Sequence, residues 1–180
     1  RSVWTLEEAH MGRTFTVSGS TTVAADPATV YAHVSDPTRM GESSPENLGA
    51  TVAEPRGEAY VGMVFDGRNK RGPARWTTRC VVTAADPGRR FAFRVVAIGL
   101  GTPRVKAPIA SWEYRFDAVA GGTLVTETWT DDRRAWPDVA ARVFDAVATR
   151  GHTFAAFQQR NIASTLRRLK QVVESSQAPA

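Results

Sequence analysis

The feature that most constrains the fold of this chain is a single change in its hydrophobic period near Pro137. From Leu48 up to that point, strand-length segments alternate with turn sequences, and no helical period interrupts them. The turns are Pro55-Arg56-Gly57, Arg71-Gly72-Pro73, Asp86-Pro87-Gly88 and Gly121-Gly122. Connections this short predict an antiparallel meander of six strands, the clearest of them over residues 76–83, 90–98, 111–119 and 123–130.

After Pro137 the period becomes helical and predicts one long helix or two helices in series. The positions that recur at spacings of three or four are Val139, Val143, Val147, Phe154, Gln158, Ile162, Leu166, Leu169 and Val173. Gly151 is the expected place for a kink or break, because glycine costs about 1 kcal/mol relative to alanine inside a helix. We expect this stripe to cover the sheet and the basic residues off the stripe to face solvent.

The segment before the meander predicts one further strand and two short helical turns. Residues 15–23 alternate as a strand does, and Asp26-Pro27 is a typical helix start with Val30, Tyr31 and Val34 as the buried positions. A second short turn is expected over residues 38–40. The fold class is therefore α+β, with a seven-stranded curved antiparallel sheet gripping a long C-terminal helix and two short helices between strands 1 and 2. A sheet curved around one helix leaves a cavity between them.

Length and composition fit one globular domain. The chain has 180 residues, 42% of them hydrophobic and 23% charged, and its net charge of +5 is scattered rather than clustered, so no nucleic-acid partner is expected. Cys80 is the only cysteine, which excludes an intrachain disulfide and favours a reducing, cytoplasmic location. No apolar stretch is long enough to span a membrane. We expect an N-terminal arm or remnant over 1–12, the domain over 13–174 and a disordered tail over 175–180; the oligomeric state is left open.

Strand alternation predicts which side chains face the cavity and hold a hydrophobic small molecule. The sheet contributes mainly large aromatic residues, and the helix contributes its side near Gln158. The expected ligand-binding residues are Phe65, Trp76, Thr78, Phe91, Phe93, Trp112, Trp129, Phe154, Phe157 and Gln158. The alternative for each ring is an ordinary place in a packed core.

Several motifs together resemble the actinobacterial polyketide cyclase/dehydrase group of the START-like (SRPBCC) superfamily. They are Asp36-Pro37-Thr38-Arg39-Met40, Ser44-Pro45-Glu46, Asp66-Gly67-Arg68-Asn69-Lys70-Arg71-Gly72, Trp76-Thr77-Thr78-Arg79-Cys80, Asp86-Pro87-Gly88-Arg89-Arg90-Phe91-Ala92-Phe93, Trp112-Glu113-Tyr114-Arg115-Phe116 and Gly121-Gly122-Thr123-Leu124-Val125-Thr126-Glu127. The resemblance runs from Thr14 to Glu174. It implies a helix-grip fold and the binding of lipids, polyketides or other apolar molecules, and some relatives catalyse ring closure and dehydration. Ser43 stands where the group often has an aromatic residue, a departure expected at the cavity mouth.

Glu127 and Tyr114 are the candidate catalytic residues. On an inward face among tryptophans, the carboxyl group of Glu127 would have a raised pKa and could act as an acid or a base, whereas a strand register slipped by one residue would place it in solvent. Tyr114 could hydrogen-bond a ligand oxygen or simply satisfy a backbone carbonyl. The three histidines lack the spacing of a metal site, and neither metal nor cofactor is expected.

Three functions remain open from the sequence. The first is binding of an apolar ligand without covalent chemistry, and the second is a cyclase/dehydratase that uses Glu127 and Tyr114. The third is an interaction module that uses the basic surface. A local group of cations, Arg68, Lys70, Arg71 and Arg75, fits either an anionic head group or a solvated turn.

Overall fold

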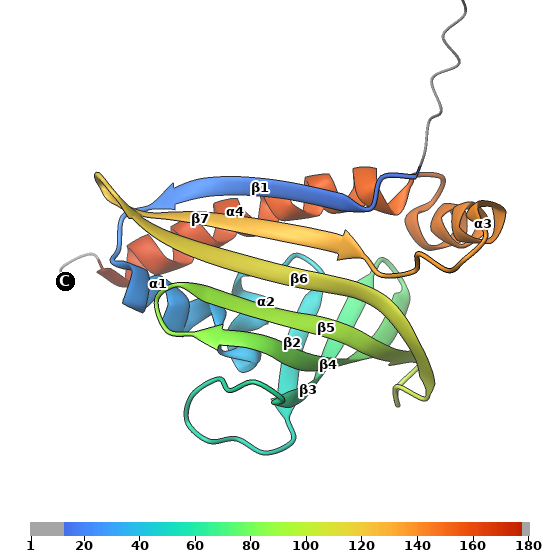
Figure 1. The fold of residues 1–180 in the computed structure, drawn as a ribbon, viewed down its shortest axis with the longest axis horizontal. Coiled ribbons are helices and arrows are strands. Elements are labelled where there is room, and N and C mark those ends of the chain that lie inside the picture. The colour runs from blue at the N-terminus through green and yellow to red at the C-terminus, as the bar shows by residue number, and fades with distance from the viewer. Residues whose placement is uncertain (1–12, 178–180) are drawn as a thin grey trace, which may run out of the picture.

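The computed structural model describes residues 13–177, which form one curved sheet wrapped around a long helix (Figure 1). All strand pairs are antiparallel, and the order across the sheet is β1-β7-β6-β5-β4-β3-β2. The strands are β1 (Thr16–Val23), β2 (Asn47–Val52), β3 (Val64–Arg71), β4 (Ala74–Asp86), β5 (Arg90–Gly99), β6 (Val105–Val119) and β7 (Gly122–Asp131). The predicted fold class, with six strands after the short helices and seven in all, is confirmed.

The short helices between β1 and β2 are α1 (Pro27–Val34), the 3-10 turn η1 (Pro37–Arg39) and α2 (Met40–Ser43). Asp26 caps α1, since its carboxylate accepts a hydrogen bond from the Thr29 backbone N–H at 2.8 Å. Asp36 caps η1 in the same way through Thr38 at 3.0 Å. As predicted, the apolar positions of α1 are buried. These turns close one end of the space between the sheet and the C-terminal helix.

The long helix α4 (Phe154–Gln177) crosses the concave side of the sheet and packs most closely on β1 (Figure 1). A glycine on β1 permits this approach, because a Cβ on Gly19 would lie only 2.8 Å from Cγ2 of Ile162. The predicted stripe of this helix is buried at Gln158, Ile162, Leu166, Leu169 and Val173. Further along, where the sheet curves away from α4, the two surfaces separate and leave room for a cavity.

The predicted stripe is wrong for the preceding helix, α3 (Asp138–Thr149). Val139, Val143 and Val147 are 74%, 61% and 80% exposed, and the buried positions are instead Ala141, Asp145 and Thr149. The two helices are separate elements, because the chain turns at Arg150 and Gly151, both with positive φ. A turn between two helices changes the direction of the second, so one apolar stripe cannot be extended from α4 into α3.

Buried polar contacts explain why α3 has this orientation. The Asp145 carboxylate accepts a hydrogen bond from Nη1 of Arg133 at 2.9 Å and another from the Phe154 backbone N–H at 3.2 Å. The first contact ties α3 to the end of the sheet, and the second caps the start of α4. Both require Asp145 to face inward, so the valines on the other side of the helix must face solvent.

The sequence predicts that both ends of the chain lie outside the folded domain. The expected arm over residues 1–12 lies outside the described residues, as do the last three residues of the expected tail. The sequence predicts a disordered tail from Ser175, but α4 continues to Gln177. Within the part of the chain that the structure describes, no helix is long and apolar enough to cross a lipid bilayer.

Candidate functional site

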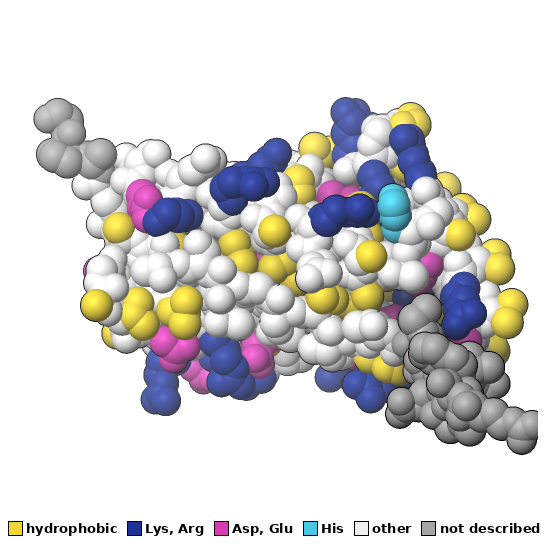
Figure 2. All heavy atoms as spheres, turned by 90° about the horizontal axis from the view of Figure 1, so that it is seen from above, with side chains coloured by type: hydrophobic (Ala, Val, Ile, Leu, Met, Phe, Trp, Pro, Cys, Tyr) yellow, Lys and Arg dark blue, Asp and Glu magenta, His cyan; other side chains and the backbone are white. Residues whose placement is uncertain are grey.

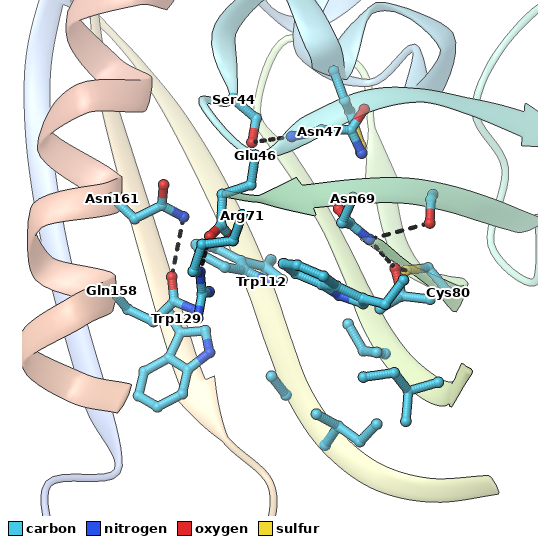
Figure 3. Close-up of a pocket in the computed structure, with 18 of the residues that line it drawn as sticks. Ser44, Glu46, Asn47, Asn69, Arg71, Cys80, Trp112, Trp129, Gln158 and Asn161 are labelled. Atoms are coloured by element: carbon cyan, nitrogen blue, oxygen red, sulfur yellow. Dashed lines mark hydrogen bonds and ion pairs between the residues drawn. The ribbon is translucent and has the colours of Figure 1, made fainter. Parts of the chain in front are cut away.

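A cavity of about 600 Å³ lies between the sheet, α4 and the short helices. Its wall on the sheet side comes from β3 to β7, and α4 forms the opposite wall. Figure 3 shows Trp112 and Trp129 on the sheet facing Gln158 and Asn161 on α4. This volume is in the range of pockets that bind small molecules, and the wall is mainly apolar with a few polar groups.

Eight of the ten expected ligand-binding residues line this cavity. They are Phe65, Trp76, Thr78, Phe93, Trp112, Trp129, Phe154 and Gln158. Six of these eight lie on β3 to β7, as period-two alternation predicts, and the other two lie on α4. Ser43, where the chain departs from the related group, also lines the cavity, although at the α2 end and away from the opening.

Phe91 and Phe157 do not line the cavity. Phe91 is fully buried at the end of β5 against which α1 packs, and its ring is 5.8 Å from the ring of Phe93. It is a core residue, packed with the other buried apolar side chains of the sheet. Phe157 lies beside the cavity, where the guanidinium of Arg71 stacks at 3.8 Å from its ring centroid.

Glu127 and Tyr114 form a hydrogen-bonded pair on the cavity wall. They are direct partners in the register between β6 and β7, and the Tyr114 hydroxyl donates to Oε1 of Glu127 at 2.7 Å. Glu127 is only 2% exposed, and its second oxygen, Oε2, is buried without a hydrogen-bond partner. The inward register that the sequence favoured is therefore the observed one.

Burial controls the charge of this pair. Burial raises the pKa of Glu127 to about 8, and the hydrogen bond from Tyr114 offsets only part of this rise. The pKa of Tyr114 lies well above its usual value, first because of burial and then because of the neighbouring carboxylate. Near neutral pH the Glu127 carboxyl group is thus largely protonated, and a small change in its surroundings would release the proton.

Further polar groups line the cavity at the β3 side. The amide of Asn69 donates to the Thr78 hydroxyl at 3.2 Å, and Nε of Arg71 donates to Glu46 at 2.5 Å (Figure 3). Arg71 also hydrogen-bonds the carbonyl of Ala148 at the end of α3, so it connects the sheet to that helix. The sequence predicts Arg71 only as one of a group of basic residues. Its contact with Ala148, 77 residues further along the chain, is not visible in any local sequence pattern.

Residues from α3 and from the loop before it complete the far end of the cavity, and the sequence did not identify them. Trp136, Phe144 and Val147 line it, as does Arg133. The guanidinium of Arg133 is neutralised by a bidentate contact with Asp131 at 2.8 and 2.9 Å and by Asp145. It therefore supports the wall and offers no free charge to a ligand.

The cavity opens between α3 and two hairpins. The wall residues that are also exposed to solvent are Pro73, Ala74, Val105, Phe144, Val147 and Arg150. They belong to the β3–β4 turn, the start of β6 and α3, and we call them the cavity mouth. His152, which lies between α3 and α4, is exposed and does not line the cavity.

In chemical terms, the site is a mainly apolar chamber with one carboxyl–hydroxyl pair on its wall. Within residues 13–177, no three His, Cys, Asp or Glu side chains are placed to hold a metal ion. The pair can exchange a hydrogen bond or a proton with a bound molecule, whereas the aromatic wall provides contact area.

Comparisons with known proteins place the chain in a family. Residues 14–174 match the model of the family described as polyketide cyclase / dehydrase and lipid transport. No curated relative was found by sequence comparison.

Solved structures share the fold. A polyketide cyclase-like protein from Corynebacterium glutamicum is 26% identical, with a TM-score of 0.57, and the match covers 93% of this chain and 96% of that one. A protein from Mycobacterium smegmatis is 19% identical, with a TM-score of 0.58 and coverage of 88% and 90%. The di-domain ARO/CYC StfQ from the steffimycin biosynthetic pathway is 15% identical, with a TM-score of 0.62 and coverage of 89% and 45%. With its curved seven-stranded sheet and gripped helix, the chain belongs to the polyketide cyclase/dehydrase and lipid transport family, a START-like group with the helix-grip fold.

Proposed function

We propose that the protein binds a hydrophobic small molecule that carries at least one oxygen, with its apolar body against the aromatic wall. The observation that carries this proposal is Oε2 of Glu127, a buried polar atom without a partner beside an apolar cavity of about 600 Å³. An unpaired polar atom of this kind costs about 1–3 kcal/mol. A ligand oxygen at this position would satisfy it.

The protonation state of Glu127 defines the ligand chemistry further. With a pKa raised to about 8 by burial, its carboxyl group can donate to a carbonyl or hydroxyl oxygen near neutral pH. A ligand carboxylate at this position would lose its hydration against a mainly apolar wall, which disfavours a charged group there. The proposed ligand is therefore a neutral, oxygenated apolar molecule of lipid or polyketide type.

Native mass spectrometry of the purified protein, followed by solvent extraction, tests the proposal. We expect a defined apolar adduct that carries a carbonyl or hydroxyl group. Glu127→Gln keeps one donor and should retain the adduct, whereas Trp129→Ala should lose it by shrinking the contact area. The proposal would be contradicted if the purified protein carried no adduct and also bound no member of a panel of oxygenated apolar compounds.

A second function, cyclisation and dehydration of a poly-β-ketone chain, is favoured by the Tyr114–Glu127 pair itself. Its carboxyl group titrates close to neutral pH, which suits general acid–base catalysis. The ionised carboxylate would remove a proton from a carbon between two carbonyls, and that carbon would then attack a third carbonyl. Glu127 would return the proton to the new alkoxide, and loss of this hydroxyl with a neighbouring proton would release water.

Glu127→Gln distinguishes the two functions. If the protein is a cyclase, this variant should lose turnover of a poly-β-ketone analogue by about 10²–10⁴-fold, the usual contribution of a general acid–base group, with little change in ligand binding. Glu113→Gln is the matched control, because Glu113 lies on the outer face of β6 and pairs with Arg90 and Arg115. Full turnover in Glu127→Gln would remove this residue from the chemistry.

A further inference from the structure

The cavity mouth is surrounded by exposed apolar side chains. Val139, Val143 and Val147 form a row along the outer side of α3, and Leu100 and Val105 lie on the hairpin across the opening. All five are exposed, although each has an aliphatic side chain. We call these five residues, together with the cavity mouth, the mouth face. Contiguous apolar groups on a surface usually mark a place that contacts something else.

Basic side chains surround this apolar group. The exposed basic residues are Arg75 next to the β3–β4 turn, Arg104 and Lys106 at the start of β6, Arg134 in the loop before α3, Arg142 on α3, and Arg150 directly after α3. The one exposed acidic residue on α3 is Asp138, which lies 3.8 Å from Arg13. Nearby Glu46 is half-buried and paired with Arg71. Figure 2 shows hydrophobic and basic side chains interspersed over the end of the molecule that carries α3.

We propose that the mouth face docks on the surface of an anionic lipid bilayer. A short helix with an aliphatic row flanked by arginines has the character of a helix that lies in a membrane interface, with its apolar side among the acyl chains and its cations at the headgroups. Anionic headgroups attract each such cation at low ionic strength. The aliphatic row on α3 beside exposed cations matches the layers of a bilayer interface, where acyl chains lie directly beneath anionic headgroups.

Docking of the mouth face would place the opening of the cavity against the bilayer. Val105 and Val147 belong both to the mouth face and to the cavity wall. A molecule leaving the bilayer at this point would pass from acyl chains to the aromatic wall without crossing water. That route rests on the proposed ligand-binding function, whereas the docking surface itself does not.

Vesicle flotation tests the docking with the full chain. The probes are vesicles of phosphatidylcholine alone and vesicles of phosphatidylcholine and phosphatidylglycerol in equal parts. We expect binding to the anionic vesicles that weakens steeply with salt, and about ten-fold or more weaker binding to the neutral ones. Absence of binding to the anionic vesicles at low salt would overturn the proposal.

Two variants identify the surface, and both change exposed residues outside the cavity wall. Val139→Asp with Val143→Asp should weaken binding to anionic vesicles by about ten-fold or more, because it places carboxylates where the acyl chains would lie. Arg104→Glu with Arg142→Glu should weaken it by at least about five-fold for each residue changed and flatten the salt dependence.

Substitutions of the same kind away from the mouth face are the controls. Val61→Asp and Arg167→Glu alter exposed residues on the β2–β3 loop and on α4, and vesicle binding should remain within about two-fold of wild type. Equal losses in the controls would overturn the assignment. So would a dimer, measured by light scattering, that dissociates in the valine variant without any vesicle binding. Vesicle binding by a protein whose cavity takes up no ligand would uphold this proposal and contradict the proposed function alone.

Discussion

The buried carboxyl group of Glu127 should make the stability of the folded protein fall as the pH rises. Burial raises its pKa from 4.5 to about 8. The folded state then holds the proton more tightly than the unfolded state between these two values, so the stabilisation is complete below the unfolded pKa and is lost as the pH rises through the folded one. At about 1.4 kcal/mol for each pH unit, the loss amounts to roughly 5 kcal/mol at most.

Urea unfolding of wild type and Glu127→Gln at about pH 5, 7 and 9 measures this effect. The glutamine variant retains a polar side chain of the same shape but cannot ionise. We expect its free energy of unfolding to gain on that of wild type as the pH rises, by several kcal/mol between the extremes. The prediction concerns how the difference between the two free energies of unfolding changes with pH, and not the size of that difference at any one pH.

Glu113→Gln is the control for this titration. Burial raises the pKa of Glu113, but hydrogen bonds from Arg90 and Arg115 lower it more, and the net shift is downward. A depressed carboxyl pKa gives stability that is lost only as the pH falls below the ordinary value. Its difference from wild type should therefore stay flat over the tested range. A parallel pH dependence for wild type and Glu127→Gln would refute the reasoning.

Three further predictions concern the packing that builds the site. Gly19→Leu should lower the free energy of unfolding by at least about 1–3 kcal/mol in urea titration, because Ile162 occupies the space that its Cβ would need. Asp145→Ala should lower it by about 3 kcal/mol and loosen α3, because Arg133 loses one of two buried carboxylates; limited proteolysis within α3 checks the second effect. Cys80, whose pKa burial raises to about 12, should react with a thiol reagent only after unfolding.

The site combines an apolar chamber with a polar pair whose state burial determines. The Tyr114–Glu127 pair lies at the centre of two antiparallel strands, where the sheet holds both side chains without help from a loop. A rigid sheet is suited to placing such a pair against a bound oxygen. By contrast, the walls near the mouth come from turns and from α3, the parts that differ most easily between relatives.

Local sequence determined much of the chemistry. Alternation along β6 and β7 alone put Tyr114 and Glu127 on the concave face, because the side-chain period of a strand is two and no bulge interrupts this pair of strands. The caps at Asp26 and Asp36 were equally local, since each carboxylate bonds within three residues. Neither inference needed knowledge of distant contacts.

Tertiary structure alone decided which end of the sheet stays open. Phe91 and Phe93 are both phenylalanines two residues apart on β5, yet Phe93 lines the cavity whereas Phe91 is fully buried in the core. The valines of α3 read as a buried stripe, but the contact between Asp145 and Arg133 rotates them into solvent. The hydrophobic period shows that a helix has two unlike faces. Which face is buried depends on contacts with residues far away in the chain, and in α3 the buried ion pair between Arg133 and Asp145 determines it.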